Sequence, residues 1–160
     1  MKNLILFALA CILLFACTPV EEPMTAEEKA QIKADVTDTF DKIIEDAKTL
    51  DIALAEQSNL FNDDYSTIMD GQISVGGDKA YEMFKGAYDY IEKYLSLEIL
   101  ELEVIVLDKN TSLIMNSFDE AYLTVTGDTV KVKGTGMYVM QLVEDKWMIV
   151  HLSGVHQPYE

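Results

Sequence analysis

Residues 97–155 read LEILELEVIVLDKNTSLIMNSFDEAYLTVTGDTVKVKGTGMYVMQLVEDKWMIVHLSGV, and this stretch decides the fold class. Every second residue from Leu100 to Val106 is apolar, and Glu101 and Glu103 stand between the first of them, which is the period-two pattern of a strand with one buried face. Three further strands are predicted at about 112–125, 129–143 and 146–155, with reversals at 127–128 and 144–145. The sequence therefore predicts a four-stranded antiparallel meander.

Helical spacing dominates the sequence before this stretch. Thr25, followed by acidic residues, is predicted to cap a long amphipathic helix that is either continuous or broken near residues 49–51. A short hairpin is predicted for 65–75 with its turn at Asp70-Gly71, and a further helix from Asp78 to Leu95. Helices followed by a meander predict an α+β domain, in which the curved antiparallel sheet wraps around about three helical stretches and leaves a concave mouth.

Composition limits the function classes. The chain has 160 residues, 49% of them apolar, which fits one domain with a real hydrophobic core. The formal charge is −16 and the sequence contains no arginine. Nucleic acid is excluded as a partner, because binding to its backbone requires clustered basic side chains.

The first 25 residues read as a targeting segment. Lys2 precedes an apolar run from Leu4 to Phe15, which is too short to span a bilayer and typical of a signal peptide. Leu14 to Cys17 resembles the bacterial lipobox, so we expect a signal peptide at 1–16, lipid on Cys17, a tether at 17–25 and a single domain at 26–160. This predicts a lipid-anchored protein of the bacterial cell envelope, on the periplasmic face of the outer membrane or on the cell surface. The alternative is an ordinary secretory peptide cut near Ala16.

Four short segments, taken in order, resemble one known branch of proteins. They are Asp51, Phe61-Asn62-Asp63-Asp64, Asp70-Gly71 with Gly76, and Lys146-Trp147-Met148-Ile149-Val150-His151. The chain resembles the SnoaL-like and ketosteroid-isomerase-like branch of the nuclear-transport-factor-2-like superfamily over about residues 30–160. The resemblance implies a cone-shaped α+β fold and a homodimer formed through the sheet. It also implies isomerase, dehydratase, hydrolase or purely binding functions.

Few residues offer chemistry. His151 is the best catalytic candidate because imidazole titrates near neutrality, and its alternative is a hydrogen-bonded histidine at the sheet rim. Asp51 and Asp64 are candidate bases, with helix capping and a loop role as their alternatives. Where the branch often reads His-x-His-x-Ser, this chain has Ser153 and Val155 after His151, so the second histidine is missing. The spacing of histidines and cysteines predicts no metal site, and no cofactor is expected.

Strict alternation in the last strand puts Trp147, Ile149, His151, Ser153 and Val155 on one face and His156 on the other. A ligand pocket is predicted, with core packing as the alternative for its aromatic members. Its predicted lining is Tyr65, Tyr88, Tyr122, Trp147, His151 and Ser153.

The leading functional hypothesis is a small-molecule-binding cone that holds a hydrophobic ligand without catalysis. The alternatives are an acid–base enzyme acting on a small hydrophobic substrate, and an interaction module with a solid cone. The interior of the cone separates the three, because an enzyme needs a desolvated titratable group facing a cavity, a binder needs the cavity only, and an interaction module needs neither.

Overall fold

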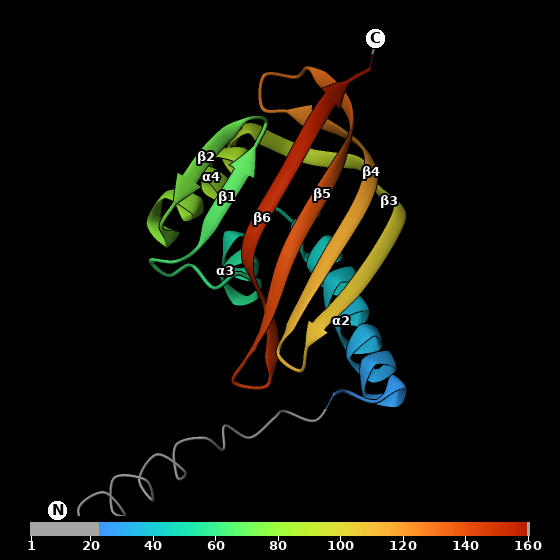
Figure 1. Ribbon diagram of the computed structural model, residues 1–160. Coiled ribbons are helices and arrows are strands. Elements are labelled where there is room, and N and C mark those ends of the chain that lie inside the picture. The colour runs from blue at the N-terminus through green and yellow to red at the C-terminus, as the bar shows by residue number, and fades with distance from the viewer. Residues whose placement is uncertain (1–22, 160) are drawn as a thin grey trace, which may run out of the picture.

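The computed structural model describes residues 23–159 (Figure 1). In this range the helices are α2 (Ala26–Ala47), α3 (Ile52–Ser58) and α4 (Gly77–Tyr90). The strands are β1 (Ser66–Met69), β2 (Gln72–Val75), β3 (Ile91–Asp108), β4 (Thr111–Thr124), β5 (Thr129–Val143) and β6 (Lys146–Pro158). The predicted α+β class with a curved sheet around three helices is confirmed. The expected signal peptide, Cys17 and most of the tether lie outside the described residues.

One sheet runs through the domain in the order β2-β1-β6-β5-β4-β3. The predicted meander forms its larger part, and the β1–β2 hairpin extends it through parallel pairing of β1 with β6. The expected sheet was wholly antiparallel. The observed sheet is mixed, because β1 and β6 run parallel. Figure 1 shows the helices gathered on one face of the sheet, while the other face is uncovered. Within residues 23–159, no helix has the length and apolar character needed to cross a membrane.

The first helix begins and ends where the local chemistry predicts. Thr25 and Glu28 form a reciprocal capping box, with the Thr25 backbone N–H donating to the Glu28 carboxylate at 2.8 Å. The helix stops at Ala47, and Leu50 adopts a φ of 60° that a continuous helix does not allow. Of the two alternatives for this segment, the broken helix is the one observed.

The predicted end of the next helix at Leu95 is wrong, because α4 ends at Tyr90 and Ile91 already belongs to β3. The apolar residues at 91 and 95 fit helical spacing, but the chain instead pairs with β4, with Ile91 opposite Thr124. Helical periodicity over a single turn is outweighed here by a long hydrogen-bonded ladder.

Bulges curve the long strands. The β3–β4 pairing has register shifts at four places, and one of them leaves Leu100 between the paired residues Ile99 and Glu101. Leu100 is 59% exposed, while Ile99 packs against the core, so the predicted inward face for Leu100 is wrong.

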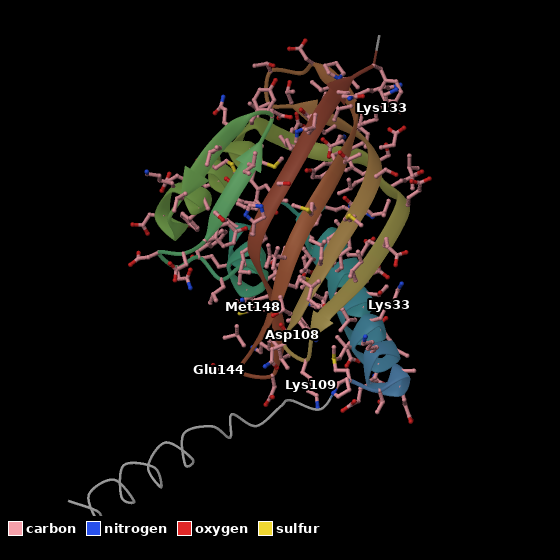
Figure 2. All side chains as sticks on the ribbon, viewed as in Figure 1. Lys33, Asp108, Lys109, Lys133, Glu144 and Met148 are labelled. Carbon is pink, nitrogen blue, oxygen red and sulfur yellow. The ribbon has the colours of Figure 1, made fainter. Side chains whose placement is uncertain are left out.

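The core fills the space between α2 and the concave face of the sheet. Phe40 of α2, Ile114 of β4 and Met140 of β5 are fully buried there. Figure 2 places Lys109 and Glu144, in the β3–β4 and β5–β6 turns, at one end of the sheet, and Lys133 towards the other end. These two ends are called the turn end and the Lys133 end below.

Candidate functional site

A cavity of about 370 Å³ lies between the helices and the concave face of the sheet. Five aromatic side chains from one helix and three strands form much of its wall: Phe84, Tyr88, Tyr94, Phe118 and Tyr138. The cavity has the size and mostly apolar lining of a small-molecule site. We call it the cone cavity.

The cone cavity continues between α2 and α3. A second space of about 110 Å³ shares Ile44, Phe84, Tyr88 and Leu152 with it and reaches Asn59 of the α3 C-cap. The two spaces together form an elongated site with an apolar inner part.

Two polar residues of β4, Asn116 and Glu120, line the cone cavity. Asn116 is 6% exposed, and its side-chain amide makes no hydrogen bond of ordinary geometry, although the Tyr138 hydroxyl lies near enough for the amide to act on its pKa. Glu120 is 8% exposed and makes no hydrogen bond or ion pair with any described residue. Burial raises the pKa of Glu120, and the nearby His156 opposes part of that rise. Buried polar groups without partners are uncommon in folded proteins, and at the wall of a cavity a bound molecule or water supplies the missing partner.

Asp70 and His156 form a pair at the Lys133 end of the cavity. The His156 backbone N–H donates to Asp70 Oδ1 at 2.7 Å, and His156 Nδ1 lies 2.9 Å from Asp70 Oδ2. Burial opposes ionisation of Asp70, but the hydrogen bonds and charge of His156 outweigh it and lower the pKa of Asp70. A carboxylate at Nδ1 favours the tautomer with the proton on Nδ1, which leaves Nε2 of neutral His156 as a proton acceptor.

The tyrosines of the cavity are hydrogen-bond donors at neutral pH. Burial, with the charge of Glu120 as a smaller cause, raises the pKa of Tyr138 to about 12, and a hydrogen-bonding interaction with Asn116 opposes part of this rise. The same two causes raise the pKa of Tyr94. Both hydroxyls therefore keep their protons.

Gly136 of β5 makes room for this arrangement. A Cβ at position 136 would lie 2.6 Å from Asn116 Oδ1 and 2.8 Å from the Tyr138 ring, closer than real Cβ atoms approach. A larger residue would therefore displace the Asn116 amide.

The predicted pocket residues do not come together. Tyr88 lines the cone cavity. Tyr65 is fully buried in the core, where its hydroxyl donates to Asn59 Oδ1 at 2.6 Å, and Trp147 is also a core residue. Tyr122 packs its ring against Tyr94.

His151 and Ser153 lie on the outer face of the sheet, because Val150 forms a bulge. Val139 pairs with His151 and Met140 pairs with Ile149, so Val150 has no partner and the alternation of β6 inverts after it. The predicted common face for Trp147 and His151 is therefore wrong, and His156 is the histidine that lines the cavity. His151 Nδ1 lies 2.8 Å from the Ser66 hydroxyl oxygen.

The two candidate carboxylates lie elsewhere. Asp51 caps α3 by accepting from the Ala53 N–H at 2.9 Å. Asp64 is exposed in the loop before β1 and does not line the cavity. Among residues 23–159, no three His, Cys, Asp or Glu side chains gather closely enough to hold a metal ion.

Sequence reasoning missed Asn116, Glu120 and His156. The sequence does contain a signal for the first two, because both share a strand face with the apolar Ile114 and Phe118. Polar residues on a buried strand face are candidates for a functional site. His156 carried no comparable signal, since its face depends on the bulge.

A groove of about 750 Å³ crosses the opposite, convex face of the sheet. We call it the outer groove. Met115, Met137 and Val155 line it together with Glu101 and Glu103. Met115 is 39% and Val155 is 48% exposed.

Solved structures resemble the domain, whereas no protein-family model and no curated protein sequence matches the chain. A nuclear-transport-factor-2-like superfamily protein from Salmonella enterica serovar Typhimurium is 15% identical with a TM-score of 0.70, covering 82% of this chain and 93% of that one. A nuclear-transport-factor-2-like protein of unknown function from Shewanella oneidensis is 17% identical with a TM-score of 0.60, covering 76% and 97%. A hexachlorocyclohexane dehydrochlorinase is 10% identical with a TM-score of 0.66, covering 85% and 94%. The chain has the cone-shaped fold of the nuclear-transport-factor-2-like superfamily, and likeness at this identity establishes the fold alone.

Proposed function

We propose that this domain binds a small, largely apolar molecule in the cone cavity. The observation that carries the proposal is the cavity of about 370 Å³, walled by aromatic side chains and lined by two polar residues of β4, Asn116 and Glu120. A solid cone would offer no such space, which disfavours the pure interaction module. Asn116 and Glu120 fix the polar end of the ligand, and its apolar part lies towards Ile44 and Leu152.

Filling the cavity tests this proposal. Leu97 lines the cone cavity, and Leu95 on the same strand is 51% exposed and does not. Leu97→Trp should abolish co-purification of a small molecule in native mass spectrometry of protein from its own host, while Leu95→Trp should retain it. Equal ligand occupancy in the two variants, both folded by circular dichroism, would overturn the proposal.

A second candidate function is acid–base catalysis on the bound molecule. It is favoured by the Asp70–His156 pair and Glu120 facing one cavity. In such a reaction His156 Nε2 takes a proton from one substrate carbon, Asp70 stabilises the imidazolium, and the imidazolium returns the same proton to another carbon of the product, which restores neutral His156. The similar dehydrochlorinase supports this candidate only through its shared fold.

The two histidines of β6 supply a matched test of catalysis. His156→Gln should abolish turnover of the co-purified molecule, followed by mass spectrometry, and His151→Gln on the opposite face should not. No turnover by the wild-type protein would leave binding as the function.

We also propose that Cys17 carries the lipid that anchors the protein in the cell envelope. The lipobox-like sequence supports this, and the domain geometry is compatible with it. Lys109 of the β3–β4 turn contacts Glu28 in the first turn of α2 at 3.2 Å, so the tether joins the domain at the turn end. His156 pairs opposite Gly134, beside Lys133, so the polar part of the cone cavity lies towards the other end. Cys17→Ala should move the protein out of the membrane fraction. Retention of the variant in the membrane fraction would refute the lipid anchor at Cys17.

A homodimer through the convex face of the sheet completes the proposal. The exposed apolar side chains of the outer groove support it, because such a patch on a sheet favours association.

A further inference from the structure

The cone cavity is lined by two carboxyl groups but by only one side chain that can carry a positive charge. Its titratable acids and bases other than tyrosine are Asp70, Glu120 and His156, and no lysine of residues 23–159 lines it. His156 is already paired with Asp70 through two hydrogen bonds. Glu120 lies near enough to His156 for the histidine charge to oppose part of the rise in its pKa, but His156 is bonded to Asp70 and Glu120 has no direct ion pair with any residue of 23–159.

Enclosing a carboxylate without a counter-charge is unfavourable, and a protein normally pairs it or neutralises it. Folding alone does not explain a glutamate at this position, since the neighbouring inward residues of β4 include Phe118 and Ile114. A positively charged group brought by a ligand would resolve the mismatch.

The surroundings of Glu120 suit an ammonium group in particular. Tyr94 and Tyr138 lie close enough for the Glu120 charge to act on them, and Tyr88 and Phe118 line the same cavity. The negative faces of aromatic rings attract cations, most strongly where water is excluded. The chain as a whole carries a formal charge of −16, which raises the local concentration of cations and repels anions.

We propose that the ligand of the cone cavity is an amphiphilic amine or quaternary ammonium compound, with its cationic head against Glu120 and the aromatic rings. This inference rests on the proposed binding function and names the chemical class of its ligand. The head lies at the β4 wall, and the apolar part extends past Tyr138 and Leu152 into the space of about 110 Å³ between α2 and α3. A carboxylate ligand would meet Glu120 and Asp70 as like charges.

Three probes of similar size separate charge from shape. They are benzyltrimethylammonium, its uncharged isostere neopentylbenzene and the anionic phenylmethanesulfonate. The wild-type protein should bind the first two and not the third, as followed by chemical-shift perturbation and calorimetry.

The deciding comparison uses Glu120→Gln, which keeps the shape of the side chain and removes its charge. Glu101→Gln is the matched control, because Glu101 lines the outer groove on the other face of the sheet. Glu120→Gln should weaken benzyltrimethylammonium at least tenfold and change neopentylbenzene less than twofold, while Glu101→Gln should change neither by more than twofold. An equal effect of Glu120→Gln on both probes would overturn the amine assignment.

If Glu120→Gln does not fold, a measurement on the wild-type protein tests the same proposal. Saturating benzyltrimethylammonium should lower the midpoint at which the Glu120 carboxyl carbon titrates in 13C NMR, and neopentylbenzene should not. Unchanged midpoints would refute the proposal. The other ionisable groups around Glu120 are Asp70 and His156, which are followed in the same spectra, and tyrosines whose raised pKa values keep them protonated. These tyrosines are Tyr88, Tyr94, Tyr122 and Tyr138.

Different results would refute the proposed binding function and the proposed amine class of its ligand. If neopentylbenzene binds and loses affinity in Leu97→Trp, but benzyltrimethylammonium shows no dependence on Glu120, the binding function stands and the amine class is wrong. If neither probe binds the wild-type protein, the amine class is wrong, and the Leu97→Trp co-purification test decides the binding function on its own.

Discussion

At the residue scale, burial of the Glu120 carboxylate lowers the stability of the folded domain, while the proposed ligand binding requires that carboxylate. Burial raises its pKa above the ordinary value of 4.5, so the folded protein holds this proton more tightly than the unfolded chain does. As pH rises from that ordinary value through the raised value, the unfolded chain ionises more readily, and the folded state loses stability. A residue kept under these conditions is typical of a functional site.

Glu120→Gln should therefore stabilise the unliganded domain at pH 7. We expect a gain of about 1 kcal/mol in the free energy of unfolding, because the variant has no carboxylate to desolvate. The gain should shrink as pH falls towards 4.5 and vanish below it, where Glu120 is protonated in both states. Urea titrations at pH 4 and pH 7 measure this, with exposed Glu101→Gln as the control. A loss of stability at pH 7 would mean that Glu120 has a stabilising partner.

At the element scale, α4 contains two glycines with opposite requirements. Gly77 is buried at the start of the helix, where an added Cβ would lie 2.3 Å from the Phe61 carbonyl carbon and 2.7 Å from the Asn62 nitrogen. Gly86 is inside the same helix, and an added Cβ there meets nothing within 4 Å. The first glycine lets two backbones approach closely, and the second only weakens the helix.

Alanine should consequently have opposite effects at the two positions. Gly77→Ala should cost about 2–3 kcal/mol, because the contacting atoms are backbone and cannot rotate away. Gly86→Ala should gain about 0.5–1 kcal/mol from its lower conformational entropy in the unfolded chain. Thermal and urea denaturation of both variants check the pair, and similar midpoints for the two would contradict the assigned contact with Phe61.

Some boundaries of helices and strands follow from the local sequence pattern, and others depend on packing against the rest of the fold. The hairpin turn at Asp70-Gly71 was predicted from its local turn chemistry, whereas the break after Ala47 was one of two alternatives that the sequence left open. The α4–β3 boundary could not be predicted, since residues 91–95 satisfy a helical pattern and a strand equally until β4 pairs with them.

At the scale of the whole molecule, the uncovered convex face of the sheet is the feature that a second copy would bury. Its outer groove combines exposed Met115 and Val155 with two glutamates at its edge. A stable homodimer needs an interface of at least about 1,200 Å² in total.

Charge placed in the outer groove should separate the copies. The domain without its leader should have the mass of a dimer in size-exclusion chromatography with light scattering at micromolar concentration, and Met115→Glu with Val155→Glu should reduce it to a monomer. Val125→Glu, at a residue that is 60% exposed and lies outside the groove, should leave the mass unchanged. A monomeric wild-type protein would overturn the dimer.

The sequence by itself determined the α+β class, the order of the elements and the capped start of α2, because periodicity and capping are local properties of the chain. It also carried the prediction of lipid on Cys17, which depends on a short linear motif. Only the tertiary structure decided which side chains meet in the cone cavity. The bulge at Val150 turns His151 outwards and His156 inwards, and the curvature of the sheet brings Asp70 of the β1–β2 turn, Glu120 of β4 and His156 of β6 to one cavity. A one-residue bulge inverts every later side chain of its strand, and it is fixed by pairing with a neighbouring strand, so no pattern within β6 announced it.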